Sequence, residues 1–145
     1  MNDVTINKIQ SIQRCVRRAR EEYEADPDGF SSNYTRQDAA ILNVMRACET
    51  AIDLANYVIR ARRMGVPVSS ADSFSLLCAG GIIDAAMAER MERMVGFRYI
   101  IIHQYTEVDI CVVEAVITSE LDELLAFASA IREQGIGAIQ RGISW

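Results

Sequence analysis

The residues best suited to chemistry lie in one octapeptide, Arg98-Tyr-Ile-Ile-Ile-His103-Gln-Tyr105, which contains the only histidine of the chain. Histidine takes up and releases protons near neutral pH, and arginine is a permanent cation that binds phosphate through two parallel hydrogen bonds. This pair indicates a phosphodiester substrate. One chain supplies a single histidine and no carboxylate cluster around it, so two copies meeting at a dimer interface would provide the separate acid and base.

Arg98, His103 and Tyr105 do not share one face of an ideal helix. The five residues from Arg98 to His103 turn the helix by about 140°. The long arginine side chain and an irregular helix end near 103–105 would reduce this separation. Considered from its position alone, His103 is a histidine at the C-terminal end of a helix, where positive charge is favourable. Arg98 is then a surface cation, or the partner of a carboxylate near the middle of the molecule.

Glu49 and Asp53 are the carboxylates expected to orient Arg98. Glu49 lies at the edge of an apolar helical stripe, and Asp53 follows one turn later. A carboxylate drawn into the interior normally finds a cationic or hydrogen-bonding partner. The sequence therefore predicts an ion pair between Arg98 and one of these two acids.

The pattern R-x4-H-x-Y resembles the signature of the HEPN ribonucleases, and within them most closely the HepT toxins. The likeness extends through four further stretches, namely MNDVTINKI at 1–9, AILNVMRACE at 40–49, SSADSF at 69–74 and RMVGFR at 93–98. It covers nearly the whole chain except the last ten or so residues. Tyr99 and Gln104 depart from the pattern, since relatives place a polar residue and an acid at these positions.

The resemblance implies a homodimeric, metal-independent endoribonuclease toxin of a HEPN/MNT toxin–antitoxin system. In this interpretation His103 takes the proton of a ribose 2′-hydroxyl, and Arg98 holds the scissile phosphate of the RNA, with transfer RNA as the family-level expectation. Tyr105 would be the site where an MNT-type nucleotidyltransferase attaches AMP, and no metal or cofactor is expected. The alternative is a non-catalytic helical subunit that binds and scaffolds the nucleotidyltransferase. A bundle that binds a cofactor is disfavoured, because Met87, Met91 and Met94 are more simply core residues.

Composition and charge limit the function further. The chain has 15 Lys and Arg against 20 Asp and Glu, a formal net charge of −5, so it is no generic nucleic-acid coat. RNA binding must come from local basic patches, and most arginines of the first two groups named next are expected to lie on solvated helix faces. Three groups of arginines are candidates: Arg14, Arg17, Arg18 and Arg20; Arg60, Arg62 and Arg63; and Arg90, Arg93 and Arg98.

Targeting and redox signals predict a cytoplasmic protein that is not a membrane protein. No signal peptide opens the chain, and no apolar run approaches the length of a membrane span. The four cysteines are scattered singly along predicted helical stripes, without a C-x-x-C pair. We expect them to be free thiols that pack as small apolar residues.

Apolar residues recur every three or four positions, which predicts an all-α protein. We expect long helices over about 4–25, 35–64, from Asp84 to within a turn of His103, and from Asp109 until Gly135 ends the last one. Thr35 would begin the second helix, and a short helix starting at Ser69 would connect the second and third long helices. The expected fold is an up-and-down antiparallel four-helix bundle with this extra connecting helix. One domain would span residues 1–134, followed by a C-terminal tail over 135–145.

Overall fold

The computed structural model describes the backbone of residues 2–103 and 109–140, and the side chains of residues 2–101 and 109–135. All regular structure in these ranges is helical. The elements in chain order are α1 (Asp3–Glu24), a 3-10 turn (Phe30–Ser32), α2 (Tyr34–Ala61), α3 (Ser70–Ala79), α4 (Ala85–His103), α5 (Ile110–Ala115), a π-helical turn (Val116–Glu120) and α6 (Leu121–Gln140).

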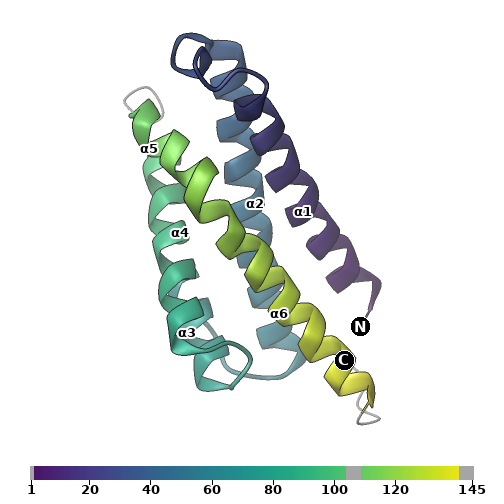
Figure 1. The fold of residues 1–145 in the computed structure, drawn as a ribbon. Helices are drawn as coiled ribbons and strands as arrows, with labels where there is room; N and C mark the ends of the chain where they lie inside the picture. The colour runs from purple at the N-terminus through teal and green to yellow at the C-terminus, as the bar shows by residue number, and fades with distance from the viewer. Residues whose placement is uncertain (1, 104–108, 141–145) are drawn as a thin grey trace.

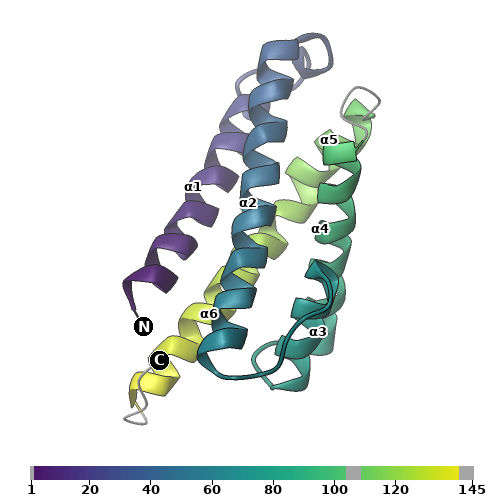
Figure 2. The ribbon, with the colours of Figure 1, turned by 180° about the vertical axis from the view of Figure 1, so that it is seen from behind.

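The long helices run alternately up and down (Figure 1). α1 and α2 form one antiparallel pair, while α4 pairs with the nearly continuous run of α5, the π-helical turn and α6. The short α3 lies beside the start of α4. Seen from behind, α2 lies between α1 and α4, with α6 on the far side (Figure 2). The predicted four-helix bundle with a short connecting helix is confirmed.

α2 is the central helix because its buried residues form one broad apolar face along its length. Val44, Leu54 and Val58 are fully or almost fully buried, and so are the small residues Ala47 and Ala51. A helix with a broad apolar face packs against more than one neighbour. α2 accordingly contacts α1, α3, α4 and α6. It is thereby the element against which the candidate site residues of α4 are positioned.

Most helix starts follow the predicted capping residues. Ser69 accepts a hydrogen bond from Asp72 N, Asp84 accepts one from Met87 N, and Asp109 accepts one from Cys111 N. The predicted start of the second helix at Thr35 is wrong. Asn33 caps it instead, with an extended backbone and a side-chain oxygen that accepts from Arg36 N at 3.1 Å.

The last helix differs from the expectation in two ways. It contains a π-helical turn at 116–120, where Leu121 N donates to Val116 O, five residues back. Thr118 Oγ1 donates to Glu114 O at 2.9 Å, a side-chain bond that competes with the regular backbone pattern. The expectation that Gly135 ends this helix is also wrong, because α6 continues to Gln140. Gly135 is buried, so this glycine lies against the core within the helix.

Two neighbouring acids at the start of α6 tie this helix to the rest of the bundle. Asp122 pairs with Arg20 of α1 at 2.7 Å, and Glu123 pairs with Arg90 of α4. At the same helix, Phe127 packs edge-on against Phe74 of α3, with ring centroids 5.4 Å apart. Both rings are fully buried. These contacts fix α6 between α1, α3 and α4.

Candidate active site

The apolar stripe of α4 places Arg98 on the side of this helix that faces the bundle. Met91, Met94 and Ile101 are buried and recur every three or four residues through position 98. Arg98 therefore emerges between core residues, and its side chain is only 26% exposed. Tyr99, on another side of α4, is 57% exposed.

Arg98 forms an ion pair with Glu49 of α2. Arg98 Nε lies 3.7 Å from Glu49 Oε1, and the Glu49 side chain is 46% exposed. Arg98 Nε is buried and has no hydrogen-bond partner in the part of the chain that the structure describes. The carboxylate thus attracts the guanidinium without saturating its donors. The Arg98 guanidinium therefore keeps donors with which it can bind an anion such as a phosphate.

Asp53 does not take part in this contact. It is exposed, one turn after Glu49 on α2, and its side chain lines a groove toward α1. The two acids that the sequence left as alternatives are therefore separated by the structure. Glu49 contacts Arg98, and Asp53 points to the α1 side of α2.

Cys48 lies in the core next to this ion pair. It is 2% exposed, and burial raises the pKa of its thiol to about 12, an effect that the nearby Arg98 opposes and Glu49 reinforces. At neutral pH the thiol is protonated, so it is no nucleophile. All four cysteines are free, and Cys48 serves as a packing residue.

His103 is the last residue of α4, five residues after Arg98 and about 7.5 Å further along the helix axis. Its side chain lies outside the described residues, as do Gln104 and Tyr105. The backbone thus places His103 and Arg98 on the same half of α4, toward the end where the loop between α1 and α2 also lies (Figure 1).

A groove of about 600 Å³ runs between α1 and α2 and reaches this site. Glu49 belongs to its wall and also contacts Arg98, so the groove and the ion pair adjoin. The lining residues from α1 are Ser11, Arg14, Cys15 and Arg18, and those from α2 are Asn43, Arg46, Glu49, Thr50 and Asp53.

Sequence reasoning missed Arg46 as a candidate. It included Arg14 and Arg18 only as members of a basic group on the first helix. The available signal was spacing, because Arg46 lies one turn before Glu49 on the same side of α2. That Arg14 of α1 lies across the groove depends on the pairing of two helices, which periodicity alone does not give.

Metal and membrane features are absent from the described chain. Residues 2–101 and 109–135 contain no group of three His, Cys, Asp or Glu side chains placed to bind a metal ion. Likewise, none of the helices that the structure describes combines the length and the apolar character needed to cross a bilayer.

Comparison with known proteins gives consistent matches over most of the chain. Residues 12–131 match the family model described as Ribonuclease HepT-like. A protein of Shewanella oneidensis named mRNA nuclease HepT is 38% identical over 134 residues, which cover 92% of this chain and 100% of that protein.

Two solved structures share the fold closely. The tri-AMPylated Shewanella oneidensis HEPN toxin in complex with MNT antitoxin has a TM-score of 0.86 at 38% identity, over 92% of this chain and 99% of that one. A toxin–antitoxin structure with AMP-PNP also has a TM-score of 0.86, at 37% identity, over 91% and 99% of the two chains. With the family model matched over most of its length and a relative this similar, the chain belongs to the HepT-like ribonuclease family of HEPN proteins.

Proposed function

We propose that this protein is the toxin of a HEPN/MNT toxin–antitoxin pair and a metal-independent endoribonuclease. The observation that carries the proposal is the half-buried Arg98, attracted by Glu49 and followed on the same helix by His103. In this proposal the ion pair holds Arg98 as the phosphate-binding cation, and His103 is the proton acceptor. The relative named mRNA nuclease HepT, 38% identical over almost all of this chain, supports RNA as the substrate.

In this mechanism His103 accepts the proton of a ribose 2′-hydroxyl, whose oxygen then attacks the adjacent phosphorus. Arg98 binds the phosphate and stabilises the negative charge that develops on its oxygens. The bond to the 5′-oxygen breaks, which leaves a 2′,3′-cyclic phosphate and a 5′-hydroxyl. DNA lacks the attacking hydroxyl and is not cleaved.

The direct test is cleavage of end-labelled RNA by pure protein in the presence of EDTA. We expect cyclic-phosphate products, no cleavage of a matched DNA, and a loss of at least about 100-fold in rate for Arg98→Ala and for His103→Ala. Messenger and transfer RNA are compared as substrates. Full activity of either variant, or a strict need for added magnesium, would contradict the mechanism.

We further propose that two chains share one cleft, because a single chain offers one histidine for both proton transfers. Leu42 supports an interface at this end of the bundle, since it is 39% exposed and lies on the same side of α2 as Glu49. In a shared cleft that uses both histidines, an excess of Arg98→Ala/His103→Ala chains forms mixed dimers with wild-type chains that lack the second acid or base. The excess should therefore suppress the activity of the wild-type chains, and wild-type chains that keep full activity in mixed dimers would exclude the shared cleft.

Neutralisation is proposed to occur by attachment of AMP to Tyr105 by an MNT-type nucleotidyltransferase. The relevant support is the AMPylated HEPN toxin solved with an MNT antitoxin, which shares this fold. Bulky anionic nucleotides near His103 would repel the RNA backbone. Co-expression followed by mass spectrometry should locate AMP on Tyr105, and Tyr105→Phe should stay unmodified and toxic.

The alternative function, a non-catalytic subunit that scaffolds the nucleotidyltransferase, is favoured by one observation. The HEPN toxin solved in complex with MNT antitoxin, which shares this fold, is bound to such a partner, and the structure with AMP-PNP is also a toxin–antitoxin structure. Expression without the partner separates the two proposals. An active toxin in the cytoplasm stops growth and its His103→Ala variant does not, whereas a scaffold leaves growth unchanged in both forms.

A further inference from the structure

The groove between α1 and α2 contains two arginines without a carboxylate partner. Arg14 and Arg46 are exposed on opposite walls, and neither guanidinium forms an ion pair or hydrogen bond with any residue that the structure describes. Two unpaired cations that line one groove repel each other. A bound anion would relieve this repulsion.

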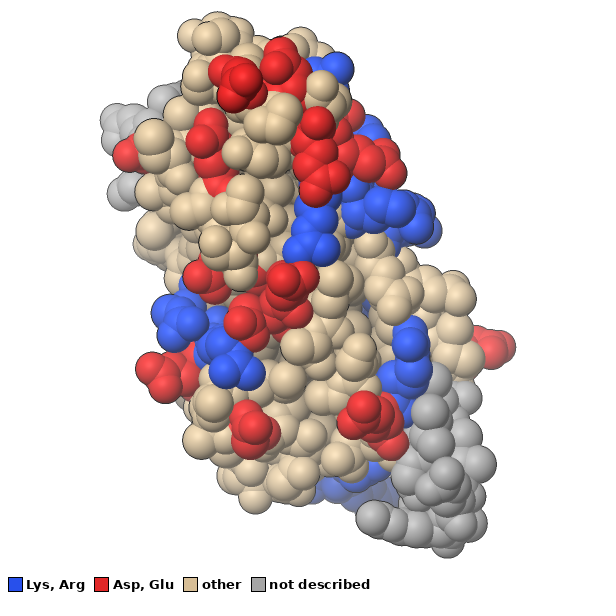
Figure 3. Space-filling view, in the orientation of Figure 1, with Lys and Arg blue, Asp and Glu red and all other residues tan. Residues whose placement is uncertain are grey.

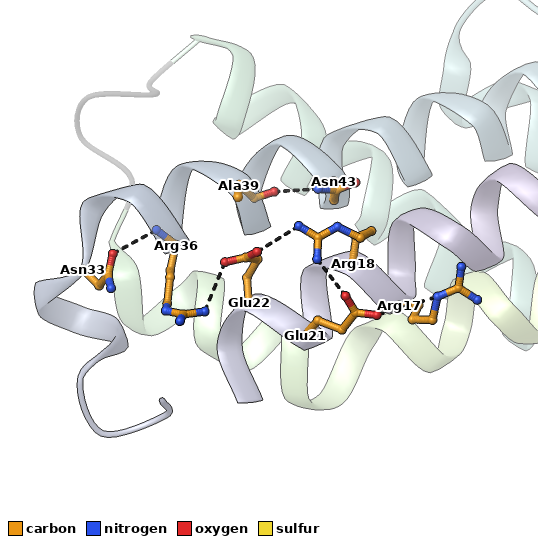
Figure 4. Close-up of polar contacts among 8 residues, drawn as sticks. All are labelled: Arg17, Arg18, Glu21, Glu22, Asn33, Arg36, Ala39 and Asn43. Carbon is orange, nitrogen blue, oxygen red and sulfur yellow. Dashed lines mark hydrogen bonds and ion pairs between the residues drawn. The ribbon is translucent and has the colours of Figure 1, made fainter. Parts of the chain in front are cut away.

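The other arginines around this groove are already neutralised. Arg18 donates to Glu21 at 2.7 Å and to Glu22 at 2.8 Å, and Arg36 of α2 reaches the same Glu22 at 3.4 Å (Figure 4). This network joins α1 to α2 at one end of the groove. It leaves the groove open between Arg18 and Glu49, where Arg14 and Arg46 are the cations free to bind a ligand.

Neutral side chains of the lining add hydrogen-bond acceptors. The side-chain amide nitrogen of Asn43 donates a hydrogen bond to Ala39 O at 2.8 Å (Figure 4). The side-chain oxygen of Asn43 therefore remains available as an acceptor. Thr50 donates its hydroxyl hydrogen to Arg46 O at 2.8 Å, so its oxygen also accepts. Ribose 2′-hydroxyls are donors as well as acceptors. Cations together with neutral acceptors suit RNA better than a free phosphate.

The acidic residues of the groove determine in which direction a bound polyanion runs. Glu49 is shared between the groove and Arg98, whose charge offsets its own. Asp53 is exposed and has no cationic partner in the described chain, so it repels phosphate from its end of the groove. A polyanion is therefore directed along Arg14 and Arg46 toward Arg98.

We propose that this groove binds the single-stranded RNA that flanks the scissile phosphate, with Arg14 and Arg46 contacting its backbone phosphates. The proposal rests on the proposed function for RNA as the ligand, and it assigns to the groove the part of the RNA that is not cleaved. The affinity for RNA then increases with RNA length beyond the two nucleotides at Arg98, whereas the rate of the cleavage step does not.

The experiment measures RNA binding in His103→Ala protein, which keeps the RNA intact. Fluorescence anisotropy with a labelled dodecanucleotide compares this protein with the Arg14→Gln/Arg46→Gln form across salt concentrations. Loss of the two arginine–phosphate contacts to a single strand should reduce the steepness of log K against log salt by about 1.4 in the groove variant. The substitutions therefore weaken binding about 25-fold more at 0.1 M than at 1 M salt. The Arg14→Gln/Arg46→Gln change should weaken binding of a dinucleotide at least about tenfold less than binding of the dodecanucleotide. The reason is that the dinucleotide ends near Arg98 and does not reach the groove.

The matched control is Arg60→Gln/Arg132→Gln, which removes the same charge from α2 and α6 outside the groove lining. The control should keep the salt slope, and Asp53→Asn should strengthen binding of the dodecanucleotide. Circular dichroism verifies that each variant is folded. An unchanged slope in the groove variant, or an equal loss in the control, would overturn the proposal.

The outcomes also separate this proposal from the ribonuclease assignment. If wild-type protein cleaves no RNA but the groove variant still loses salt-dependent affinity, the groove binds RNA and the nuclease mechanism is wrong. If wild-type protein cleaves RNA and the groove variant binds the dodecanucleotide as tightly as its parent, the groove proposal is wrong and the mechanism stands.

Discussion

Replacing Glu49 by glutamine isolates what its carboxylate does for Arg98. The side chain keeps its size, and the ion pair at 3.7 Å loses its charge. Because the carboxylate is nearly half exposed, the pair stabilises the fold by about 0.2–1 kcal/mol. The unfolding temperature should fall by no more than about 2–4 °C, so the variant stays folded at assay temperature.

The effects of Glu49→Gln on catalysis have opposite signs for binding and chemistry. Removing a negative charge beside the bound phosphate lowers KM by about threefold, from Coulomb repulsion at high effective dielectric constant. Losing the charge that attracts Arg98 leaves the guanidinium less well placed, which lowers kcat by about tenfold. A residue with only a structural role would change neither quantity selectively.

The assay is steady-state cleavage of a fluorogenic RNA at constant ionic strength, with melting temperatures measured on the same samples. Glu89→Gln is the matched control, because Glu89 is exposed on α4 and lies about 13 Å from Arg98 along the axis. It removes the same charge without touching Arg98. If Glu49→Gln leaves kcat within twofold of the control, the carboxylate does not orient Arg98 and the reasoning fails.

Three further predictions concern the scaffold. Phe74→Ala removes a fully buried ring that packs on Phe127 and should cost about 3–5 kcal/mol in denaturant unfolding; a cost below 1 kcal/mol would contradict this packing. Asn33→Ala should cost about 1 kcal/mol as the loss of a helix cap, and more than Thr35→Ala, which is the outcome the sequence reasoning would have reversed. The Cys48 thiol holds its proton more tightly when folded, so its contribution to stability is present below pH 9 and is lost as the pH rises toward 12. Unfolding free energies at about pH 8 and pH 10.5 should therefore differ less in Cys48→Ala than in wild type.

The bundle could be predicted because each helix carries its own evidence. The buried residues of α1 and α4 repeat at helical spacing, and Ser69, Asp84 and Asp109 cap the helices that follow them. These signals act within a few residues of the chain. They do not depend on how the helices pack, so a single sequence contains them.

The helix ends that could not be predicted from the sequence are those where two local conformations have similar free energies. Asn33 and Thr35 are both good capping residues, and the extended backbone at Asn33 decides between them. Gly135 is a common helix end, yet here it is buried and the helix continues. The gain from packing outweighs a glycine penalty of about 1 kcal/mol.

The choice between Glu49 and Asp53 needed the tertiary structure. Both acids lie on α2 within one turn, and either one has the reach to meet an arginine. The direction in which each acid points around α2 decides which one meets Arg98, since Glu49 contacts it and Asp53 lines the groove toward α1. Helical periodicity alone does not tell which neighbouring helix each side of α2 meets.

The overall negative charge does not contradict an RNA substrate, because binding depends on the charges close to the bound phosphate and not on the total. Acidic and basic side chains alternate over the face seen in Figure 3 rather than forming a separate acidic surface. Among the residues that the structure describes, several acids pair with arginines, namely Glu21, Glu22, Glu49, Asp122 and Glu123. At physiological salt a phosphate senses charges within about 8 Å. In the groove those are chiefly Arg14 and Arg46, so the local field and not the net charge determines what binds there.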